Sequence, residues 1–147
     1  MKSSIYKLFL SIFLFVGVST QAQETVITKN ELPQSAQKFI SDNFSNHTLD
    51  YIKKDKEFFS TDYQVKFTDG TEIDFDSDGD WTEVDGDKSG LPTGFIHNNI
   101  VRYVKEHFAN ATIVRIEKGR FGKQEVKLSN GLELEFNAKG EFKRIDD

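Results

Sequence analysis

The acidic segment from Asp74 to Asp85 has the residue types and spacing that come closest to metal-binding chemistry in this chain. It holds six acidic residues and no basic one. Calcium takes about six to eight oxygen ligands, and calcium-binding loops place oxygens at positions 1, 3 and 5, a glycine at 6 and a carboxylate at 12. In this segment those positions fall on Asp74, Asp76, Asp78, Gly79 and Asp85.

The same segment is also typical of a hairpin turn, because aspartate and glycine both favour turn geometry. The corresponding stretch 61 residues later reads Glu135, Asn137 and Lys139, with a lysine inside the turn. That stretch is expected to form its turn without a metal. The last carboxylate of the segment belongs to an aspartate, whose short side chain makes bidentate closure around calcium harder.

Repulsion among the aspartates of this segment makes calcium binding an alternative to a plain turn. Four aspartates within seven residues repel one another unless a cation neutralises them, whereas a hairpin needs only one or two. We therefore predict weak calcium binding, in the millimolar range of extracellular modules, as an alternative to a plain turn. The candidate metal ligands are Asp74, Asp76, Asp78, Asp80 and Asp85.

Aromatic residues occupy two loop segments that are expected to lie at hairpin tips. Phe58 and Phe59 lie in the segment 54–62, and Phe121 lies in the segment 119–122. Exposed aromatic side chains are frequent anchors for protein partners, so the three are candidate partner-binding residues. The alternative is that they fold back onto the sheet and belong to the core.

No set of residues in the sequence predicts an enzyme. A serine nucleophile would need a Gly-x-Ser-x-Gly-like elbow and an oriented histidine, and neither is found. A glycine-rich phosphate loop is also missing. The three histidines show no metal-ligand spacing. We therefore expect a protein that is not an enzyme and has no certain cofactor, with calcium as the open possibility.

The first 22 residues resemble an export signal rather than part of the fold. Lys2 and Lys7 form a basic start, residues 8–18 are apolar, and Thr20-Gln21-Ala22 offers a small-residue cleavage site. The apolar run of about 11 residues is shorter than the roughly 20 that a membrane span needs. We expect a periplasmic or secreted protein with no membrane span after removal of the signal.

Composition narrows the partners and the chemistry further. The chain has 147 residues and a net charge of −5; without the signal it has 17 basic and 24 acidic residues, which gives −7. An acidic chain without a basic stripe is not expected to bind nucleic acid. The absence of cysteine excludes disulfides, thiolate zinc sites and a lipid-modified cysteine anchor.

Two parts of the chain match each other in sequence. Residues 64–85 aligned with residues 125–146 at a constant offset of 61 are identical at seven of 22 positions. Leu32-Pro33 and Leu91-Pro92 extend the match upstream, with small changes of length. We interpret the match as a duplicated unit of about 60 residues.

Each unit is predicted to begin with a helix and to continue with four antiparallel strands. Pro33 and Pro92 suit the first turn of a helix, and apolar residues then recur at the spacing of one buried stripe. The expected strands of the first unit are 49–53, 63–67, 72–75 and 81–84, with glycine turns between them. Helices should cover one face of each sheet, and a charged face with Lys66, Glu72 and Asp74 should remain in water.

These motifs carry a resemblance to a known family. A cleavable signal, a Leu-Pro pair before an amphipathic helix, the strand Tyr-Gln-Val-Lys-Phe at 63–67 and Phe-Asp-x-Asp-Gly-Asp-Trp at 75–81 together resemble the PepSY-like domain of exported Bacteroidetes proteins. The resemblance covers residues 32–145 and implies a fold similar to that of the beta-lactamase inhibitory protein. It also implies a non-catalytic, inhibitory or regulatory exported module.

The predicted fold class is therefore α+β, a tandem repeat of a helix plus a four-stranded antiparallel sheet. The predicted segments are a signal peptide (1–22), an N-terminal lead-in (23–31), a first PepSY-like repeat (32–85), a linker (86–90) and a second PepSY-like repeat (91–147). The predicted function is recognition or inhibition of an unknown protein or peptide through the sheet face or the hairpin tips. The alternative is a calcium-binding or calcium-regulated periplasmic protein that uses the hairpin from Asp74 to Asp85.

Overall fold

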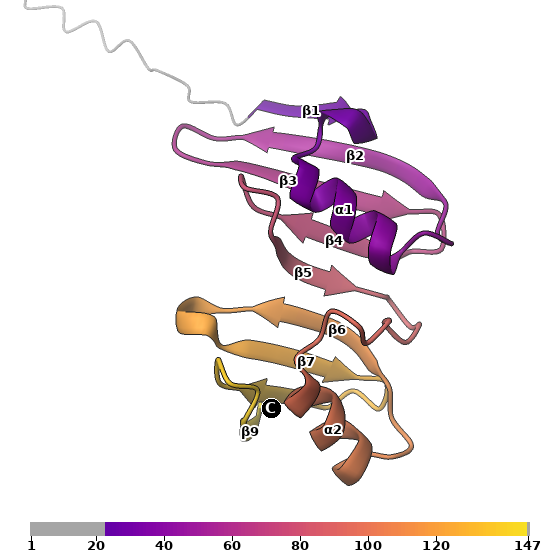
Figure 1. The fold of residues 1–147 in the computed structure, drawn as a ribbon, viewed down its shortest axis with the longest axis vertical. Coiled ribbons are helices and arrows are strands. Elements are labelled where there is room, and N and C mark those ends of the chain that lie inside the picture. The colour runs from indigo at the N-terminus through magenta and orange to yellow at the C-terminus, as the bar shows by residue number, and fades with distance from the viewer. Residues whose placement is uncertain (1–22, 147) are drawn as a thin grey trace, which may run out of the picture.

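The computed structural model describes residues 23–146, which form nine strands and two α-helices (Figure 1). The helices are α1 (Gln34–Asn43) and α2 (Asn98–His107), and short 3-10 turns cover Lys29–Glu31 and Arg120–Gly122. The strands are β1 (Gln23–Ile27), β2 (Leu49–Lys56), β3 (Thr61–Phe67), β4 (Glu72–Phe75), β5 (Trp81–Asp85), β6 (Ile113–Lys118), β7 (Gln124–Leu128), β8 (Glu133–Phe136) and β9 (Phe142–Asp146).

All nine strands belong to one antiparallel sheet, in which each strand pairs with its neighbours in the sequence. The prediction of a tandem repeat, in which each unit is a helix plus a four-stranded antiparallel sheet, is therefore wrong. β5 pairs with β6 through Glu83 with Glu117, Val84 with Ile116 and Asp85 with Arg115, and these pairs make the sheet continuous. We refer to β1–β5 as the N-terminal half of this sheet and to β6–β9 as the C-terminal half.

The ninth strand is β1, in a segment that was predicted to be only a lead-in. Its residues 23–27 pair with residues 52–56 of β2 along the full length of β1. β1 is an edge strand, and its side chains are largely exposed, so its stabilising contacts come from one neighbour.

The core lies on one face of the sheet, as the alternation of apolar and polar residues predicts. Val65, Ile73, Val84, Ile116 and Val126 are all buried, and they lie on neighbouring strands that pair in register. Both helices cover this face, α1 over the N-terminal half and α2 over the C-terminal half (Figure 1). Within residues 23–146 no helix covers the opposite face, which is called the open face below.

α1 is held by aromatic contacts and by the turn between β4 and β5. Phe39 packs edge-on against Phe75 at 5.7 Å between ring centroids and stacks on Trp81 at 6.2 Å. The turn contains Gly79 with φ +81°, and a Cβ there would clash with Pro33 and Ser35 at the start of α1. The glycine therefore serves both the left-handed backbone and the close approach of the helix.

α2 begins at Asn98, so the prediction that Pro92 lies in the first helical turn is wrong. The residues between them form a loop whose Phe95 ring lies 5.1 Å from Phe39 and 5.4 Å from Trp81. His97 then caps the helix, because its Nδ1 accepts a hydrogen bond from the backbone N–H of Asn99 at 3.2 Å. The loop thus places an aromatic side chain of the second matching segment in the core of the N-terminal half.

The predicted signal peptide, residues 1–22, lies outside the described residues. Within residues 23–146, neither helix has the length and apolar character that crossing a membrane requires.

Candidate functional site on the open face of the sheet

The open face carries a row of acidic side chains that runs across five consecutive strands. Successive register pairs join Asp74 to Glu83, Glu83 to Glu117, Glu117 to Glu125, and Glu125 to Glu135. Like charges directly opposite one another on neighbouring strands destabilise a sheet unless cations lie between them. The location of those cations therefore determines the electrostatics of this face.

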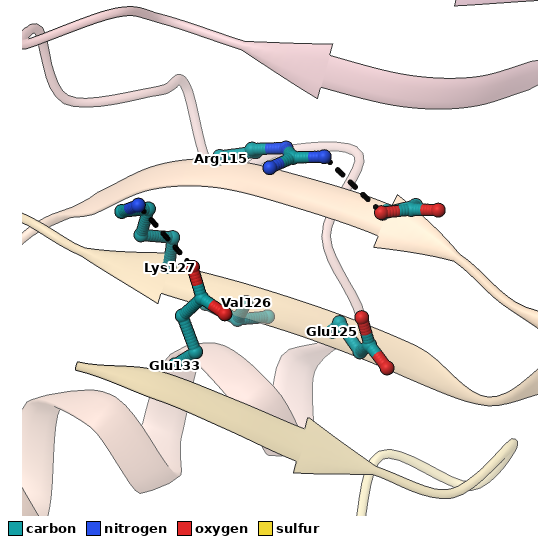
Figure 2. Close-up of a pocket in the computed structure, with 6 residues that line it drawn as sticks. Arg115, Glu125, Val126, Lys127 and Glu133 are labelled. Carbon is teal, nitrogen blue, oxygen red and sulfur yellow. Dashed lines mark hydrogen bonds and ion pairs between the residues drawn. The ribbon is translucent and has the colours of Figure 1, made fainter. Parts of the chain in front are cut away.

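In the middle of the row, one arginine neutralises two carboxylates. Arg115 Nε lies 2.6 Å from Glu83 Oε1, and its second terminal nitrogen lies 3.3 Å from Glu117 Oε2. Lys127 faces Arg115 directly across β6 and β7, and its Nζ lies 3.2 Å from Glu133 Oε1. Figure 2 draws this part of the open face, where Arg115 and Lys127 each pair with an acidic side chain.

In the C-terminal half, Glu135 has two cationic partners. Lys123 Nζ lies 3.0 Å and a terminal nitrogen of Arg144 lies 2.9 Å from the same carboxylate oxygen. Lys123 also lies 2.6 Å from Glu125 Oε1. The acidic end of the row is therefore neutralised within the chain.

In the N-terminal half, Asp74 is the counterpart of Glu135, and both of those cations are replaced by acids. The residues 61 positions before Lys123 and Arg144 are Asp62 and Glu83. Asp74 Oδ1 is buried and has neither a hydrogen-bond nor an ion-pair partner among the described residues. Asp74 is thus an acidic side chain of the row that lacks a cation of its own.

The environment of Asp74 shifts its titration strongly. Burial, followed by the negative charges of Glu72 and Glu83, raises the pKa of Asp74 from 3.8 to about 6. The amide of Gln64 opposes this rise in part, but its Nε2 donates its hydrogen bond to Glu72 Oε1 at 2.9 Å. A positive charge placed beside Asp74 would favour the ionised carboxylate and bring its pKa down.

A hollow of about 320 Å³ lies over Asp74 on the open face. Asp55 also lines it with a buried oxygen that has no partner, and Asp55 faces Asp62 directly across β2 and β3. The one basic residue of the lining, Lys53, pairs with Glu24 at 2.8 Å. The hollow is lined by Glu24, Lys53, Asp55, Asp62, Tyr63, Gln64, Asp74, Phe75 and Thr82.

The candidate metal ligands that the sequence predicts are spread over different positions. Asp74 lies on the open face, whereas Asp76 Oδ1 accepts hydrogen bonds from the N–H groups of Asp78 and Asp80, each at 3.0 Å. Asn137 forms the same turn with a neutral amide oxygen, accepting from Lys139 and Glu141 at 3.0 and 2.9 Å. The turn role of Asp76 therefore needs no metal.

The remaining candidates have other contacts. The carbonyl oxygen of Asp78 accepts a hydrogen bond from Ser35 Oγ at 2.6 Å, and Asp85 Oδ1 accepts one from the N–H of Asp87 at 2.7 Å. Lys118 places its ammonium 3.9 Å from the centre of the Trp81 ring, and the charges of Asp80 and Asp76 act on it. The positive charge of Lys118, on β6, therefore compensates part of the negative charge of the turn. Calcium binding by the five aspartates stays a prediction.

A different set of carboxylates comes together in the C-terminal half. Ligand oxygens of Glu125, Glu135 and Asp146 lie within 4.8 Å of one another, and this is the one such group that residues 23–146 form. Lys123 and Arg144 already pair with these acids. A metal ion would have to compete with both cations.

The three candidate partner-binding phenylalanines are exposed at hairpin tips. Exposure is 81% for Phe58, 94% for Phe59 and 100% for Phe121. Phe58 and Phe59 pack edge-on against each other at 4.6 Å rather than on the sheet. Phe121 has φ +58°, a left-handed conformation that costs energy for a bulky residue and marks a functional candidate. Partner binding by these residues stays a prediction.

Sequence reasoning missed the unpaired Asp74 and the hollow around it, although a signal was present. Positions 62 and 123, and positions 83 and 144, carry opposite charges in otherwise similar segments. A reversal of charge sign at matched positions indicates that ion pairs formed in one segment have no counterpart in the other. In the structure, the two acidic residues at these positions, Asp62 and Glu83, both act on the carboxylate of Asp74.

Comparison with known proteins identifies related folds. A family model described as "Putative beta-lactamase-inhibitor-like, PepSY-like" matches residues 18–62 and 61–144. No curated protein matches the chain.

Three solved structures are similar to the chain over most of its length. One, described as a "putative calcium-regulated periplasmic protein" from Bacteroides thetaiotaomicron, is 35% identical, with a TM-score of 0.80 over 84% of this chain and 97% of its own. Another, described as a "putative periplasmic protein" from Bacteroides vulgatus, is 34% identical, with a TM-score of 0.79 over 85% and 98% of the two chains. A second one from that organism, described as of unknown function, is 37% identical, with a TM-score of 0.78 over 85% and 100%.

The raised pKa of Asp74 predicts a stabilising substitution. Protonated Asp74 is favoured in the folded state, so its contribution to stability is present below about pH 3.8 and is lost as the pH rises through about 6. Asp74→Asn should therefore raise the free energy of unfolding at pH 7.5 by about 1 kcal/mol, after allowance for solvent screening, and leave it unchanged near pH 4. Urea unfolding at the two pH values measures this.

The matched control is Glu135→Gln, which removes a carboxylate that has two cationic partners. It should lower the free energy of unfolding at pH 7.5 by about 1 kcal/mol, because Lys123 and Arg144 each lose one of their two acidic partners. Equal effects of the two substitutions would contradict the assignment of Asp74 as the unpaired member.

Proposed function

The chain belongs to the PepSY-like family, and from that premise we propose that it is an exported, non-catalytic binding protein that recognises a protein or peptide through its open face. Its anchor is a basic side chain of the partner placed in the hollow over Asp74. The family description and those of the three solved relatives name no catalytic activity. Periplasmic relatives support an extracytoplasmic location for this chain as well.

The single observation that carries the proposal is the missing counter-ion of Asp74. The C-terminal half supplies cations for Glu135 from within the chain, whereas the N-terminal half leaves Asp74 unpaired in a hollow of about 320 Å³. A lysine or arginine of a partner would take the position that Lys123 takes beside Glu135. Such charge-assisted hydrogen bonds give both orientation and specificity. Inhibition of the bound protein would follow where the open face covers its functional surface.

A single substitution tests this proposal by supplying the missing cation. Asp62→Lys copies Lys123 at the matched position, and its ammonium should pair with Asp74 and Asp55. We expect a higher melting temperature and at least a tenfold loss of affinity for the partner, a typical cost at a buried charge pair. Thermal denaturation measures the first effect. Affinity capture from a periplasmic extract, followed by mass spectrometry and quantified binding of the retained protein, measures the second.

The control for that experiment is Glu106→Lys, which makes the same change of net charge on the exposed surface of α2. It should leave capture of the partner unchanged. Retention of the same protein in equal amounts by the wild type and by Asp62→Lys would contradict the proposal. A fall in melting temperature for Asp62→Lys would contradict the assigned role of the hollow.

The hairpin tips form a second part of the proposed partner-binding surface. Phe58 and Phe59 extend from the β2–β3 hairpin and Phe121 from the β6–β7 connection, and both tips lie at the same end of the sheet, at the left of Figure 1. Aromatic side chains near the edge of an interface can add apolar contact to the charged contact at its centre.

Removal of the three rings tests this second part. The triple variant Phe58→Ala, Phe59→Ala and Phe121→Ala should keep the melting temperature within about 2 °C, because the rings are exposed and make no core contacts. It should weaken binding of the captured partner by about tenfold or more, as loss of interface anchors does. A large drop in melting temperature would instead make these residues part of the core.

A second candidate function is calcium regulation, favoured by the description of the relative from Bacteroides thetaiotaomicron as calcium-regulated. We propose the hairpin ligands Asp74, Asp76, Asp78, Asp80 and Asp85 for it, because their negative charge is only partly offset by Lys118. The carboxylates of Asp78 and Asp80 make no hydrogen bond in the described part of the chain, so both are free to turn toward an ion. The acidic group of Glu125, Glu135 and Asp146 is the competing location.

Isothermal titration with calcium separates the two locations. We expect weak binding, with a dissociation constant of about 1 mM, that is lost in Asp78→Asn with Asp80→Asn. The control pair Glu125→Gln with Asp146→Asn should bind as the wild type does. Loss of binding in the control pair alone would move the site to the C-terminal half, and no heat for the wild type would remove calcium regulation from consideration.

A further inference from the structure

A second hollow lies on the helix side of the sheet, where the end of α1 and the loop after it meet β2. Its volume is about 220 Å³, roughly the liquid volume of seven water molecules. We call it the Leu49 hollow. It is lined by Lys29, Ile40, Ser41, Phe44, Ser45, His47, Leu49, Ile52 and Phe67.

One apolar residue of the Leu49 hollow, Leu49 itself, is partly exposed above a buried floor, unlike its match in the C-terminal half. Leu49, at the start of β2, is 39% exposed, whereas Ile113, at the start of β6, is 5% exposed. The chain before α2 runs beside Ile113, where the N–H of Leu91 donates to the carbonyl oxygen of Ile113 at 2.8 Å. No such backbone bond from the segment before α1 reaches Leu49 within residues 23–146.

One ammonium group lies at the edge of the Leu49 hollow without an acidic partner in the described part of the chain. Lys29 Nζ makes a single contact, a long hydrogen bond of 3.4 Å to Ser41 Oγ. The neighbouring acids are engaged elsewhere, since Glu31 accepts hydrogen bonds from Thr28 at 2.7 Å and Asp42 pairs with Lys38 at 2.6 Å. His47 at the other side pairs with Asp69 at 2.7 Å.

We propose that the Leu49 hollow binds a small aliphatic carboxylate, with the alkyl chain against Leu49 and the apolar floor and the carboxylate at Lys29 Nζ. The charge of Lys29 selects an anion, and the exposed leucine selects an apolar tail. The volume limits the ligand to a short chain, because it is below the range of about 300–1,000 Å³ that is usual for larger ligands. This site lies on the other side of the sheet from the open face and does not depend on the function proposed for that face.

Octanoate is the probe for this site, and methyl NMR of the purified protein reports where it binds. The methyl signals of Ile40, Leu49 and Ile52 should shift and saturate in the millimolar range, which burial of about five methylene groups supplies. Signals from the matched residues of the other half, Val104, Ile113 and Ile116, should not move. No shifts, or equal shifts in both halves, would overturn the proposal.

Two further measurements test the charge and the location. Lys29→Gln should weaken octanoate binding about fivefold, as expected for one solvent-exposed ion pair, while Lys88→Gln, 59 positions later, should leave it unchanged. Neutral 1-octanol should bind the wild type as weakly as octanoate binds Lys29→Gln. Equal binding of octanoate and octanol to the wild type would overturn the assignment of Lys29 as the carboxylate partner.

Discussion

The pairing of β5 with β6 is the constraint on which the rest of the structure depends. Among residues 23–146, three register pairs connect β5 with β6, and the central one, Val84 with Ile116, is fully buried. This register aligns acidic side chains across five strands and brings Arg115 between Glu83 and Glu117. The same contact that makes the sheet continuous thus fixes where repulsion arises and which cation relieves it.

The two halves of the sheet relieve this repulsion between carboxylates differently, and the difference distinguishes the two ends of the open face. Near Glu135, Lys123 and Arg144 lie within ion-pair distance, so the cost of burying the carboxylate is offset inside the chain. Near Asp74 the corresponding positions are acidic, and the cost appears as a raised pKa and an unpaired oxygen. A protein that keeps such a destabilising arrangement commonly does so for binding or catalysis.

Local patterns in the sequence predicted the strands well and the global arrangement poorly. The alternation in residues 63–67 and the glycine turns at 70 and 79 are local, so β3, β4 and β5 lie where they were expected. The pairing of β5 with β6 joins residues about 30 positions apart and leaves no periodic signal, so one continuous sheet could not be distinguished from two. Pro92 suggested a helix start, but Gly94 and the packing of Phe95 near Trp81 delay α2 to Asn98.

The cluster of acids in one hairpin suggested a single metal site. In the structure, these acids lie in different places and make different contacts. Side chains of a strand alternate between faces, so Asp74 lies on the open face, while the turn that follows uses Asp76 as an acceptor for backbone N–H groups. Asp85, at the far end of β5, accepts from the next turn. The aspartates of this hairpin are therefore farther apart in space than their closeness in the sequence suggested. Asp62 of β3, which lies outside this hairpin segment, also acts on Asp74, because its negative charge contributes to the raised pKa of Asp74.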